Sequence, residues 1–392
     1  MLISNCTEKL LELKGAIVKN IEIIEEKFFV DVVMEKRIHK CPNCMTETSK
    51  VHDYRTQLVK HTPATGRPVI LRLRKRRYVC PRCNKRFFES VSFLPKYQRT
   101  SNTLWWYVLS ELTSVSSMKS IAKRASVSTH TIARILDSTS YGCTSLPDNL
   151  SIDEFRGNAG GEKFQCILTD PKKKQVLDIL PSKKSADIYD YFSKFKNRKN
   201  VKTVTMDLST YFKSIARACF PNAKIVADKF HAQRLAVYAF ESVRKEEQRK
   251  FATSRRKYFK RSRTLLLKDK AKLTTADLEQ VSLMLSISKP LAMAYHLKNL
   301  VYELFDAQDL HTAKKRMLAF QMAAQVSNLE AFHKVAATYT QWEKEILNIF
   351  TTGLSNGFTE GCNNKIKVIK RNAFGMHNYE RFRKRILHQM SN

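Results

Sequence analysis

The first third of the chain shows two hydrophobic patterns, one typical of strands and one typical of helices. The segment KNIEIIEEKFFVDVVM (19–34) is rich in β-branched and aromatic residues and predicts short strands. RPVILRLRKRRYV (67–79) also predicts strands. From Asn102 to about Ser138, apolar residues instead recur at three- and four-residue steps. This second period predicts short helices joined near ASVS (125–128).

Strand and helix patterns alternate between Leu150 and Phe230. LSIDEF (150–155) predicts a strand, and KFQCILTDPKKKQVLDIL (163–180) predicts a hairpin that turns at Asp170–Pro171. A helix, a strand, a second helix and a second strand are predicted downstream. Three consecutive strands followed by this alternation predict a mixed sheet flanked by helices.

From His231 to about Thr352 the hydrophobic pattern is that of helices. RKEEQRKFATSRRKYFKRSRTLLLKDK (244–270) predicts a long, very basic amphipathic helix. Loop residues begin at Gly353, and the helical pattern resumes through NNKIKVIKRN (363–372) and again at NYERFRKRILHQM (378–390).

The charge balance indicates a polyanionic partner. The chain of 392 residues carries 70 Lys and Arg against 36 Asp and Glu, a formal net charge of +34. This excess is typical of proteins that bind nucleic acid. A membrane surface is the weaker alternative, because no long apolar run is present and the N-terminus lacks the features of a signal peptide. We therefore expect a cytoplasmic protein with no membrane partner.

Two Cys-x2-Cys pairs predict a structural zinc site. An odd total of nine cysteines argues against a disulfide framework in an intracellular chain. Four thiolates complete a tetrahedral Zn²⁺ site that contributes folding energy and leaves no open position for catalysis. The gap between the pairs exceeds the usual 15–20 or so residues, but strands over 67–79 would return the second pair beside the first. Redox dithiols or ordinary buried cysteines are the alternatives. The predicted ligands are Cys41, Cys44, Cys80 and Cys83.

Two segments are candidate DNA contacts. The first is the basic stretch of the zinc module, suited to phosphate binding, with Arg72, Arg74, Lys75, Arg76 and Arg77. The second, SMKSIAKRASVSTHTIARIL (117–136), resembles a helix-turn-helix with Ile132 and Ile135 facing inward. A plain helical hairpin that supports the next domain is the alternative. The outward residues suited to phosphate and base-edge contacts are Ser128, Thr129, His130 and Arg134.

Two aspartates are expected at one edge of the mixed sheet. Asp153 ends the first predicted strand, and Asp207 ends the strand VKTVTMD (201–207). With a third carboxylate, such a pair can bind two divalent cations about 3.5–4 Å apart, which activate the attacking oxygen and stabilise the leaving oxygen in phosphodiester transfer. Mg²⁺ suits such oxygen ligands. Strand-terminal aspartates are also common turn residues. Glu154 should point to the opposite face.

Three blocks of sequence resemble the bacterial DDE transposases of the ISL-three insertion-sequence family. The blocks are SIDEFRG, TMDLSTYFKSIARACFPNAKIVADKFHAQRL and SNGFTEGCNNKIKVIKRNAFGMHNYERFRKRIL. Because the cysteine pairs and the helix-turn-helix precede them in the family's order, the resemblance covers nearly the whole chain. It implies an RNase H-like catalytic domain that uses Mg²⁺ or Mn²⁺, with a helical insertion before the glutamate. It also implies a bacterial protein associated with the nucleoid. The implied triad is Asp153, Asp207 and Glu360.

The resemblance also implies supporting residues. Asp228 and His231 match a motif that organises the active site or contacts DNA; a capping aspartate with a packed histidine is the alternative. Glu360 by itself reads as a solvated residue that balances lysines, whereas a metal ligand beside DNA should have cations and amides around it. The phosphate-binding residues expected on its helix, some on the sheet face and some outward, are Asn363, Asn364, Lys365, Lys367, Lys370 and Arg371.

These predictions combine into a multidomain α+β protein. We expect a transposase that binds the terminal inverted repeats of its element, hydrolyses a phosphodiester to release a 3′-hydroxyl, and uses that hydroxyl to attack target DNA without a covalent protein intermediate. Synapsis of two ends requires a homo-oligomer. A structure-specific RNase H-like nuclease and a transcription regulator with an inactive catalytic domain are the rivals. The predicted domains are a zinc ribbon (1–98), a helix-turn-helix (99–145), a first catalytic part (146–231), an all-helical insertion (232–352) and C-terminal catalytic helices with the glutamate (353–392).

Overall fold

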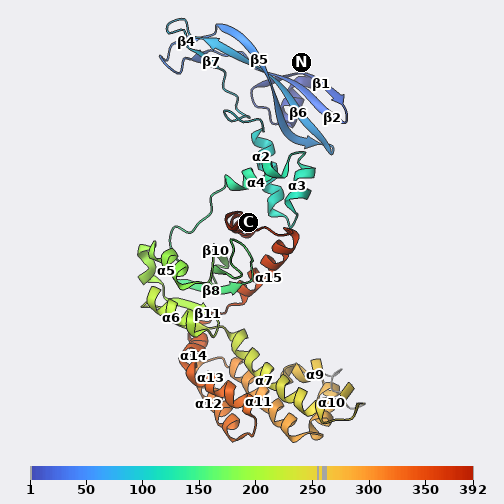
Figure 1. Cartoon of the computed structure of the whole chain (residues 1–392), viewed down its shortest axis with the longest axis vertical. Coiled ribbons are helices and arrows are strands. Elements are labelled where there is room, and N and C mark those ends of the chain that lie inside the picture. Colours follow the sequence, from blue (N-terminus) through green and yellow to red (C-terminus); the bar gives the residue numbers. More distant parts are fainter. Residues whose placement is uncertain (1, 254–255, 258–262, 392) are drawn as a thin grey trace. The chain divides into compact units, whose positions relative to one another are not determined.

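The computed structural model describes residues 2–253, 256–257 and 263–391. The chain divides into two compact units, one of Met1–Tyr141 with Val368–Asn392 and the other of Gly142–Lys367 (Figure 1). No helix among the described residues is both long and apolar enough to cross a bilayer.

A twisted sheet forms the N-terminal part of the first unit, as the strand patterns predicted. Its order is β1-β2-β6-β5, with β7 also paired to β6. Val32 and Leu73 are buried in its core, and alternate residues of β2 and β6 face inward. The elements are α1 (Leu2–Leu10), β1 (Ala16–Ile24), β2 (Lys27–Met34), β3 (His39–Lys40), β4 (Glu47–Thr48), β5 (Val51–Ala64), β6 (Arg67–Val79) and β7 (Arg86–Phe88).

Three short helices follow, α2 (Asn102–Thr113), α3 (Met118–Arg124) and α4 (Thr129–Asp137). A serine caps each one, and its hydroxyl accepts a hydrogen bond from a backbone N–H in the first turn. The predicted turn between α3 and α4 is present, with Ser126 in the left-handed region at φ 54°.

The C-terminal helix α16 (Tyr379–Met390) packs against α2 and α4. Arg385 Nη2 donates to the carbonyl oxygens of Ser114 and Ser116 at 2.9 Å each, and His388 Nε2 lies 2.7 Å from the carbonyl oxygen of Leu109. The sequence prediction placed residues 353–392 entirely in the catalytic part. The structure assigns residues 368–392 to the first unit, because these contacts and the buried Phe382 bind α16 to the short helices.

A five-stranded mixed sheet forms the centre of the second unit. Its order is β10-β9-β8-β11-β12, with β8, β11 and β12 parallel and β9 antiparallel to both β8 and β10. The predicted hairpin between β9 and β10 is confirmed, because Asp170 Oδ1 accepts hydrogen bonds from the backbone of Lys172 and Lys173. The strands are β8 (Asn149–Phe155), β9 (Gln165–Asp170), β10 (Gln175–Leu180), β11 (Thr203–Met206) and β12 (Lys224–Ala227).

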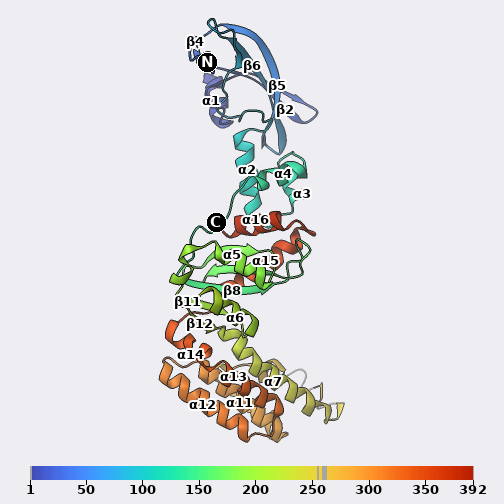
Figure 2. The same ribbon diagram turned by 60° about the vertical axis from the view of Figure 1, so that its left-hand side comes forward.

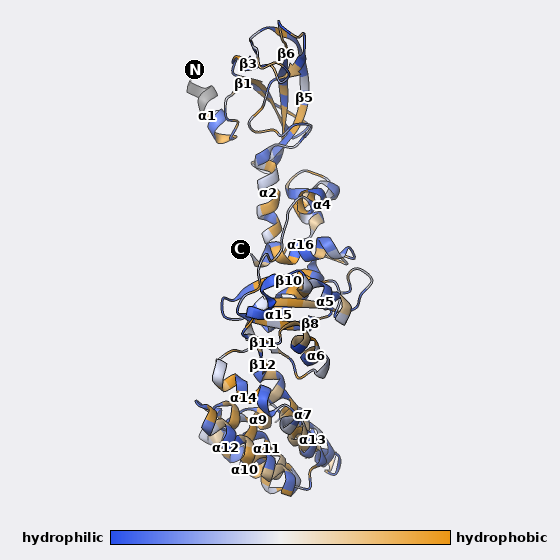
Figure 3. Cartoon of the chain, turned by 90° about the vertical axis from the view of Figure 1, so that its left-hand side faces the viewer, coloured by the Kyte–Doolittle hydropathy of each residue, from blue (hydrophilic) through white to orange (hydrophobic). Residues whose placement is uncertain are grey.

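Helices complete the second unit. Hydrophobic and hydrophilic residues alternate around them (Figure 3). The apolar faces of the helices between 229 and 352 share one core, whereas those of the helices between 185 and 219 pack with the mixed sheet in another. The predicted basic helix over 244–270 is interrupted, because α7 ends at Arg249; residues 254–255 and 258–262 lie outside the described residues. The elements are α5 (Ser185–Ser193), η1 (Lys196–Asn200), α6 (Thr210–Cys219), α7 (Lys229–Arg249), α9 (Arg263–Leu267), η2 (Lys270–Lys272), α10 (Thr275–Ser286), α11 (Lys289–Phe305), α12 (Leu310–Val326), α13 (Glu330–Gln341), α14 (Glu343–Thr352) and α15 (Gly357–Asn372).

Helix α15 begins earlier than predicted. The sequence predicted a loop up to about residue 362, but the helix starts at Gly357, so Glu360 lies in its first turn. Glycine disfavours helix by about 1 kcal/mol relative to alanine. Burial of Thr359 and Cys362 against the rest of the unit overrides that preference.

Candidate functional site

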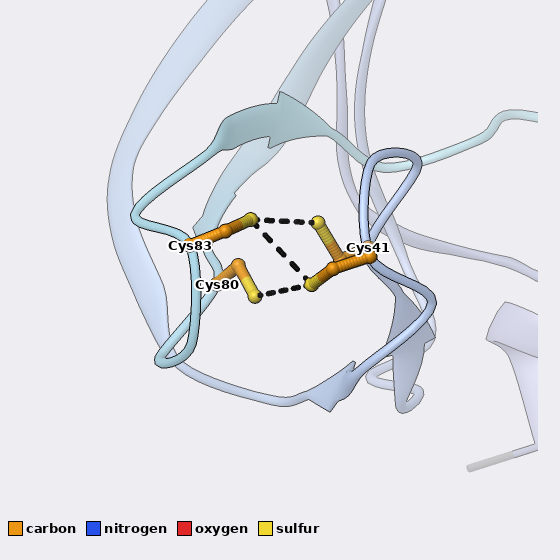
Figure 4. A group of neighbouring side chains, drawn as sticks. Cys41, Cys80 and Cys83 are labelled. Atoms are coloured by element: carbon orange, nitrogen blue, oxygen red, sulfur yellow. Dashed lines mark hydrogen bonds between the residues drawn. The ribbon is translucent and has the colours of Figure 1, made fainter.

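The four predicted zinc ligands converge in the first unit. The sulfurs of Cys41 and Cys83 lie 3.5 Å apart, and Cys44 lies 3.4 Å from Cys80 and 3.5 Å from Cys83 (Figure 4). A tetrahedral ion with Zn–S bonds of about 2.3 Å needs sulfurs roughly 3.8 Å apart, so the residues fit zinc. Hydrogen bonding with Thr46 lowers the pKa of Cys44 to about 6, which favours the thiolate.

The local backbone explains this convergence. Each pair forms the same tight turn: Met45 N donates to Cys41 O at 2.9 Å, and Asn84 N donates to Cys80 O at 3.0 Å. The long strands β5 and β6 pair antiparallel from Val51 opposite Tyr78, so the residues before β5 and after β6 return to the same place. The long gap between the two pairs is therefore a hairpin.

The basic residues of β6 are largely engaged within their own sheet. Arg72 donates to Asp31 at 2.7 and 2.8 Å, and Arg76 pairs with the buried Glu89 at 3.0 Å. Three further contacts involve the remaining predicted residues: Arg77 with Asp53 at 3.3 Å, Arg74 over the Tyr54 ring at 4.2 Å, and Lys75 over the Phe88 ring at 5.7 Å. Of these five residues, Arg74 is exposed and the other four are half-buried.

Helix α4 presents the predicted face to solvent. Ile132 and Ile135 are buried against α2 and α3, as the pattern predicted. The four residues expected to face outward are all exposed, namely Ser128, Thr129, His130 and Arg134.

The two aspartates meet at one edge of the mixed sheet. β8 and β11 are parallel and pair up to Ser151 and Thr205, so Asp153 and Asp207 each follow two residues later. β8 continues to Phe155, so Asp153 lies within the strand and past its last pairing with β11. Burial of Asp153, together with the like charge of Asp207, raises the pKa of Asp153 to about 7.

Helix α15 is held on this edge by a hydrogen-bond network. Asn363 Nδ2 donates to Asp153 Oδ2 at 2.7 Å. Thr359 lies 2.7 Å from the hydroxyl of Thr169 on β9 and donates to Ser151 on β8 at 3.0 Å. Glu360 is half-buried and precedes Asn363 by three residues, so it belongs to the same helix face.

Sequence reasoning missed most of this network. Ser151 and Thr169 are fully buried in strands of otherwise apolar character, and Asn356 also hydrogen-bonds Ser151. Buried hydroxyls need partners. The small polar residues of LSIDEF and QCILTD could therefore have indicated a buried hydrogen-bond network, but they did not identify α15 as the partner.

Asp228 and His231 adjoin Asp207. Asp228 caps α7 by accepting hydrogen bonds from the backbone of Phe230 and His231, and its Oδ2 also lies 2.5 Å from His231 Nδ1. The same nitrogen lies 2.9 Å from Asp207 Oδ1. These two acids raise the pKa of His231 to about 10. Asp228 therefore both caps α7 and contacts the His231 ring, which also contacts Asp207.

The acidic group fits a divalent cation. His231 Nδ1 has one proton, and its shorter contact is to Asp228. The buried Asp207 Oδ1 accordingly makes no hydrogen bond within the described part of the chain. Asp153 is buried beside this like charge. Oxygen ligands of this kind suit Mg²⁺ or Mn²⁺, and a cation would offset the repulsion.

The predicted phosphate-binding residues of α15 lie on its outer face. Asn364, Lys365, Lys367 and Arg371 are all exposed. Lys367 Nζ donates to Asn364 Oδ1 at 3.1 Å. Asn363, which was also expected to hold phosphate, is buried on the sheet side instead and donates to Asp153.

Comparison with known proteins matches both regions of the chain. Residues 150–386 match a DDE family model of the ISL3 group described as "Transposase", and residues 37–83 match the "zinc-finger of transposase IS204/IS1001/IS1096/IS1165". A curated relative, the "Transposase for insertion sequence element IS1001" of Bordetella parapertussis, is 27% identical over 358 residues, covering 88% of this chain and 87% of the relative.

The parallel strands with paired aspartates and the separate four-cysteine module are thus those of a DDE transposase. The chain belongs to the ISL3 family of these enzymes, since the family model covers more than half of its length. Binding and cleavage of DNA are typical of this family.

Proposed function

We propose that Asp153, Asp207 and Glu360 are the catalytic triad of this transposase and bind the divalent ions, Mg²⁺ or Mn²⁺. The observation that carries the proposal is the junction of β8, β11 and α15, where Asp153 and Asp207 end up side by side and Asn363 links α15 to Asp153. The sheet order, with β9 as the antiparallel strand, supports an RNase H-like fold.

The protein's own residues prepare this site. Asn363 orients the Asp153 carboxylate, and the Asp228–His231 pair fixes the position of Asp207. Divalent ions bound here supply activation of the attacking oxygen and stabilisation of the leaving oxygen. Glu360 completes the ligand set from the first turn of α15.

The reaction comprises two phosphodiester exchanges. In the first, water attacks the phosphorus at the element's end and the 3′-oxygen leaves, which releases a 3′-hydroxyl. In the second, that hydroxyl attacks a phosphodiester of the target DNA, so one P–O bond forms as another breaks. No covalent bond to the protein is needed.

Recognition of the terminal inverted repeats is assigned to the first unit. Four thiolates binding Zn²⁺ stabilise the ribbon, and α3 with α4 forms a helix-turn-helix whose outer face reads DNA. Because α16 packs on these helices, we revise this domain to residues 99–141 together with the C-terminal residues from 368. The mixed sheet, residues 232–352 and the start of α15 form the catalytic domain and its helical insertion. Synapsis of two ends requires at least two protomers.

The test is Mg²⁺-dependent cleavage of DNA that carries the flanking sequence of the gene. Glu360→Gln keeps the shape of the side chain and removes its charge, so cleavage at the repeat boundary should fall at least about 10³-fold, or roughly 4 kcal/mol in the barrier. DNA binding should persist.

The matched control is Glu154→Gln, which removes a neighbouring carboxylate that pairs instead with Lys183 at 2.8 Å. It should cleave at nearly the normal rate. Cleavage that survives Glu360→Gln would remove Glu360 from the triad, and binding without cleavage by the unmodified protein would favour a regulator.

A further inference from the structure

Helix α7 carries a row of exposed aromatic and basic side chains. Phe230, Arg234 and Tyr238 are spaced four residues apart and therefore lie on one face. Phe230 is 49% exposed and Tyr238 is 56% exposed, although the opposite face of the helix is packed into the unit's core. We call these three residues the aromatic row.

The row is ordered by its own contacts. Arg234 Nε donates to the Tyr238 hydroxyl at 2.6 Å, and the guanidinium carbon lies 5.3 Å from the centre of the Tyr238 ring. Exposed Lys245 and Arg249 continue the same face along the helix. A positively charged surface with two exposed rings is therefore already formed.

The row begins at the acidic site. Phe230 is the neighbour of His231, whose Nδ1 lies 2.9 Å from Asp207. β12 ends at Ala227 and α7 begins at Lys229, and Figure 2 shows α7 running from there into the group of helices. A DNA strand with its phosphate at Asp207 would have neighbouring nucleotides within reach of Phe230.

We propose that the aromatic row binds unpaired bases of the DNA strand next to the phosphodiester that is cleaved. In a duplex the faces of the bases are covered by stacking, so an aromatic ring at its surface meets mainly sugar and phosphate. Unpaired bases expose those faces and stack on aromatic side chains, and arginine adds an attraction of its own. Opening the end of the duplex also exposes the strand to the active site.

This proposal rests on the proposed function of the acidic site and specifies the DNA form that the site receives. Stacking is tolerant of sequence because every base has a π-face. The row therefore contributes affinity for opened ends of any sequence, and the identity of the repeat is read elsewhere.

The experiment measures affinity by fluorescence anisotropy, without added Mg²⁺, for two DNAs with the same terminal repeat. One is fully paired, and the other has three mismatched base pairs at the cleavage boundary. Phe230→Ala and Tyr238→Ala should each weaken binding to the opened DNA by about 5- to 100-fold, the range for one lost stacking contact. Binding to the paired DNA should change less than about twofold.

Two variants serve as controls. Tyr238→Phe keeps the ring and should retain most of the affinity. Tyr189→Ala removes an exposed aromatic residue from α5 of the same unit and should bind both DNAs normally.

Equal affinity of the alanine variants and the unmodified protein for opened DNA would overturn the proposal. Equal losses on both DNAs would overturn it too, and a simultaneous loss of self-association in sedimentation would show that the row is a protein interface. These results are distinguishable from failure of the proposed function, in which the unmodified protein binds neither DNA or Glu360→Gln still cleaves.

Discussion

The four-cysteine cluster and the acidic cluster are both candidate metal centres, but they are built in opposite ways. The cysteines come from two matching turns at the base of one hairpin, and all four are already at ligand distance. Asp153 and Asp207 come from two parallel strands, and the fold holds these like charges close together. Bound zinc would stabilise the ribbon, whereas burying like charges side by side lowers stability.

The pKa shifts at the two centres are also opposite. Hydrogen bonding lowers the pKa of Cys44, so a ligand is ready for the metal. At the acidic site burial and Asp207 raise the pKa of Asp153, and the cation His231⁺ is placed between Asp207 and Asp228. The positive charge of His231 thus offsets part of the repulsion between Asp207 and Asp228, as a bound cation would.

Removing a ribbon ligand should have the largest effect. Cys80→Ser should abolish zinc binding and unfold the ribbon, because structural zinc contributes about 10–16 kcal/mol in small zinc domains. Zinc content and DNA affinity measure this loss. Exposed Cys6→Ser is the control and should keep one zinc per chain. Unchanged zinc content and affinity in Cys80→Ser would disprove the four-cysteine site.

The acidic centre should show the opposite dependence, a gain in stability on neutralisation. The pKa of Asp153 rises from its ordinary 3.8 to about 7, so between these values the folded protein holds a proton that the unfolded chain has released. The contribution of Asp153 to the free energy of unfolding without added Mg²⁺ should therefore fall as pH rises from about 4 to 7, by up to about 4 kcal/mol at ~1.4 kcal/mol per pH unit.

Asp153→Asn should remove this pH dependence. Denaturant unfolding across the same pH range measures it, and the variant should be more stable than the unmodified protein at pH 7.5. Glu154→Gln should leave the slope intact. If the free energy of unfolding of Asp153→Asn kept the same dependence on pH, the buried Asp153 carboxyl would not be the group that lowers stability.

The smallest effect separates two kinds of basic residue in the first unit. Arg134 is exposed on α4, so Arg134→Ala should weaken binding to repeat DNA by about 1–3 kcal/mol or, for a phosphate contact, reduce the salt slope by about 1. Arg76 is committed to Glu89, so Arg76→Ala should lower the thermal stability of the sheet and leave the salt slope unchanged. Titration of DNA at several salt concentrations tests both. If Arg76→Ala reduced the salt slope and Arg134→Ala did not, the DNA-binding surface would lie on the ribbon instead of on α4.

The basic stretch of β6 shows where sequence reasoning reached its limit. A run of arginines and lysines signals positive charge, but its availability depends on the acids that the fold brings near. Asp31 and Glu89 lie far from Arg72 and Arg76 along the chain, and only strand pairing makes them partners. The helix α16 is similar: its amphipathic pattern predicted a helix, but not the short helices that cover its apolar face.

What the sequence determined by itself is local chemistry. Some features depend on contacts within a few residues and can therefore be recognised in a short stretch of sequence. They are the cysteine turns, the serine caps, the hairpin at Asp170 and the inward face of α4. The order of the strands also predicted a shared edge for Asp153 and Asp207, provided that their strands are neighbours, and the structure pairs those strands. Only the tertiary structure decided that Asn363 and not a lysine holds Asp153, and that the aromatic row starts beside this edge. These features depend on strand register and helix packing between distant segments, whose energies are set by the whole core.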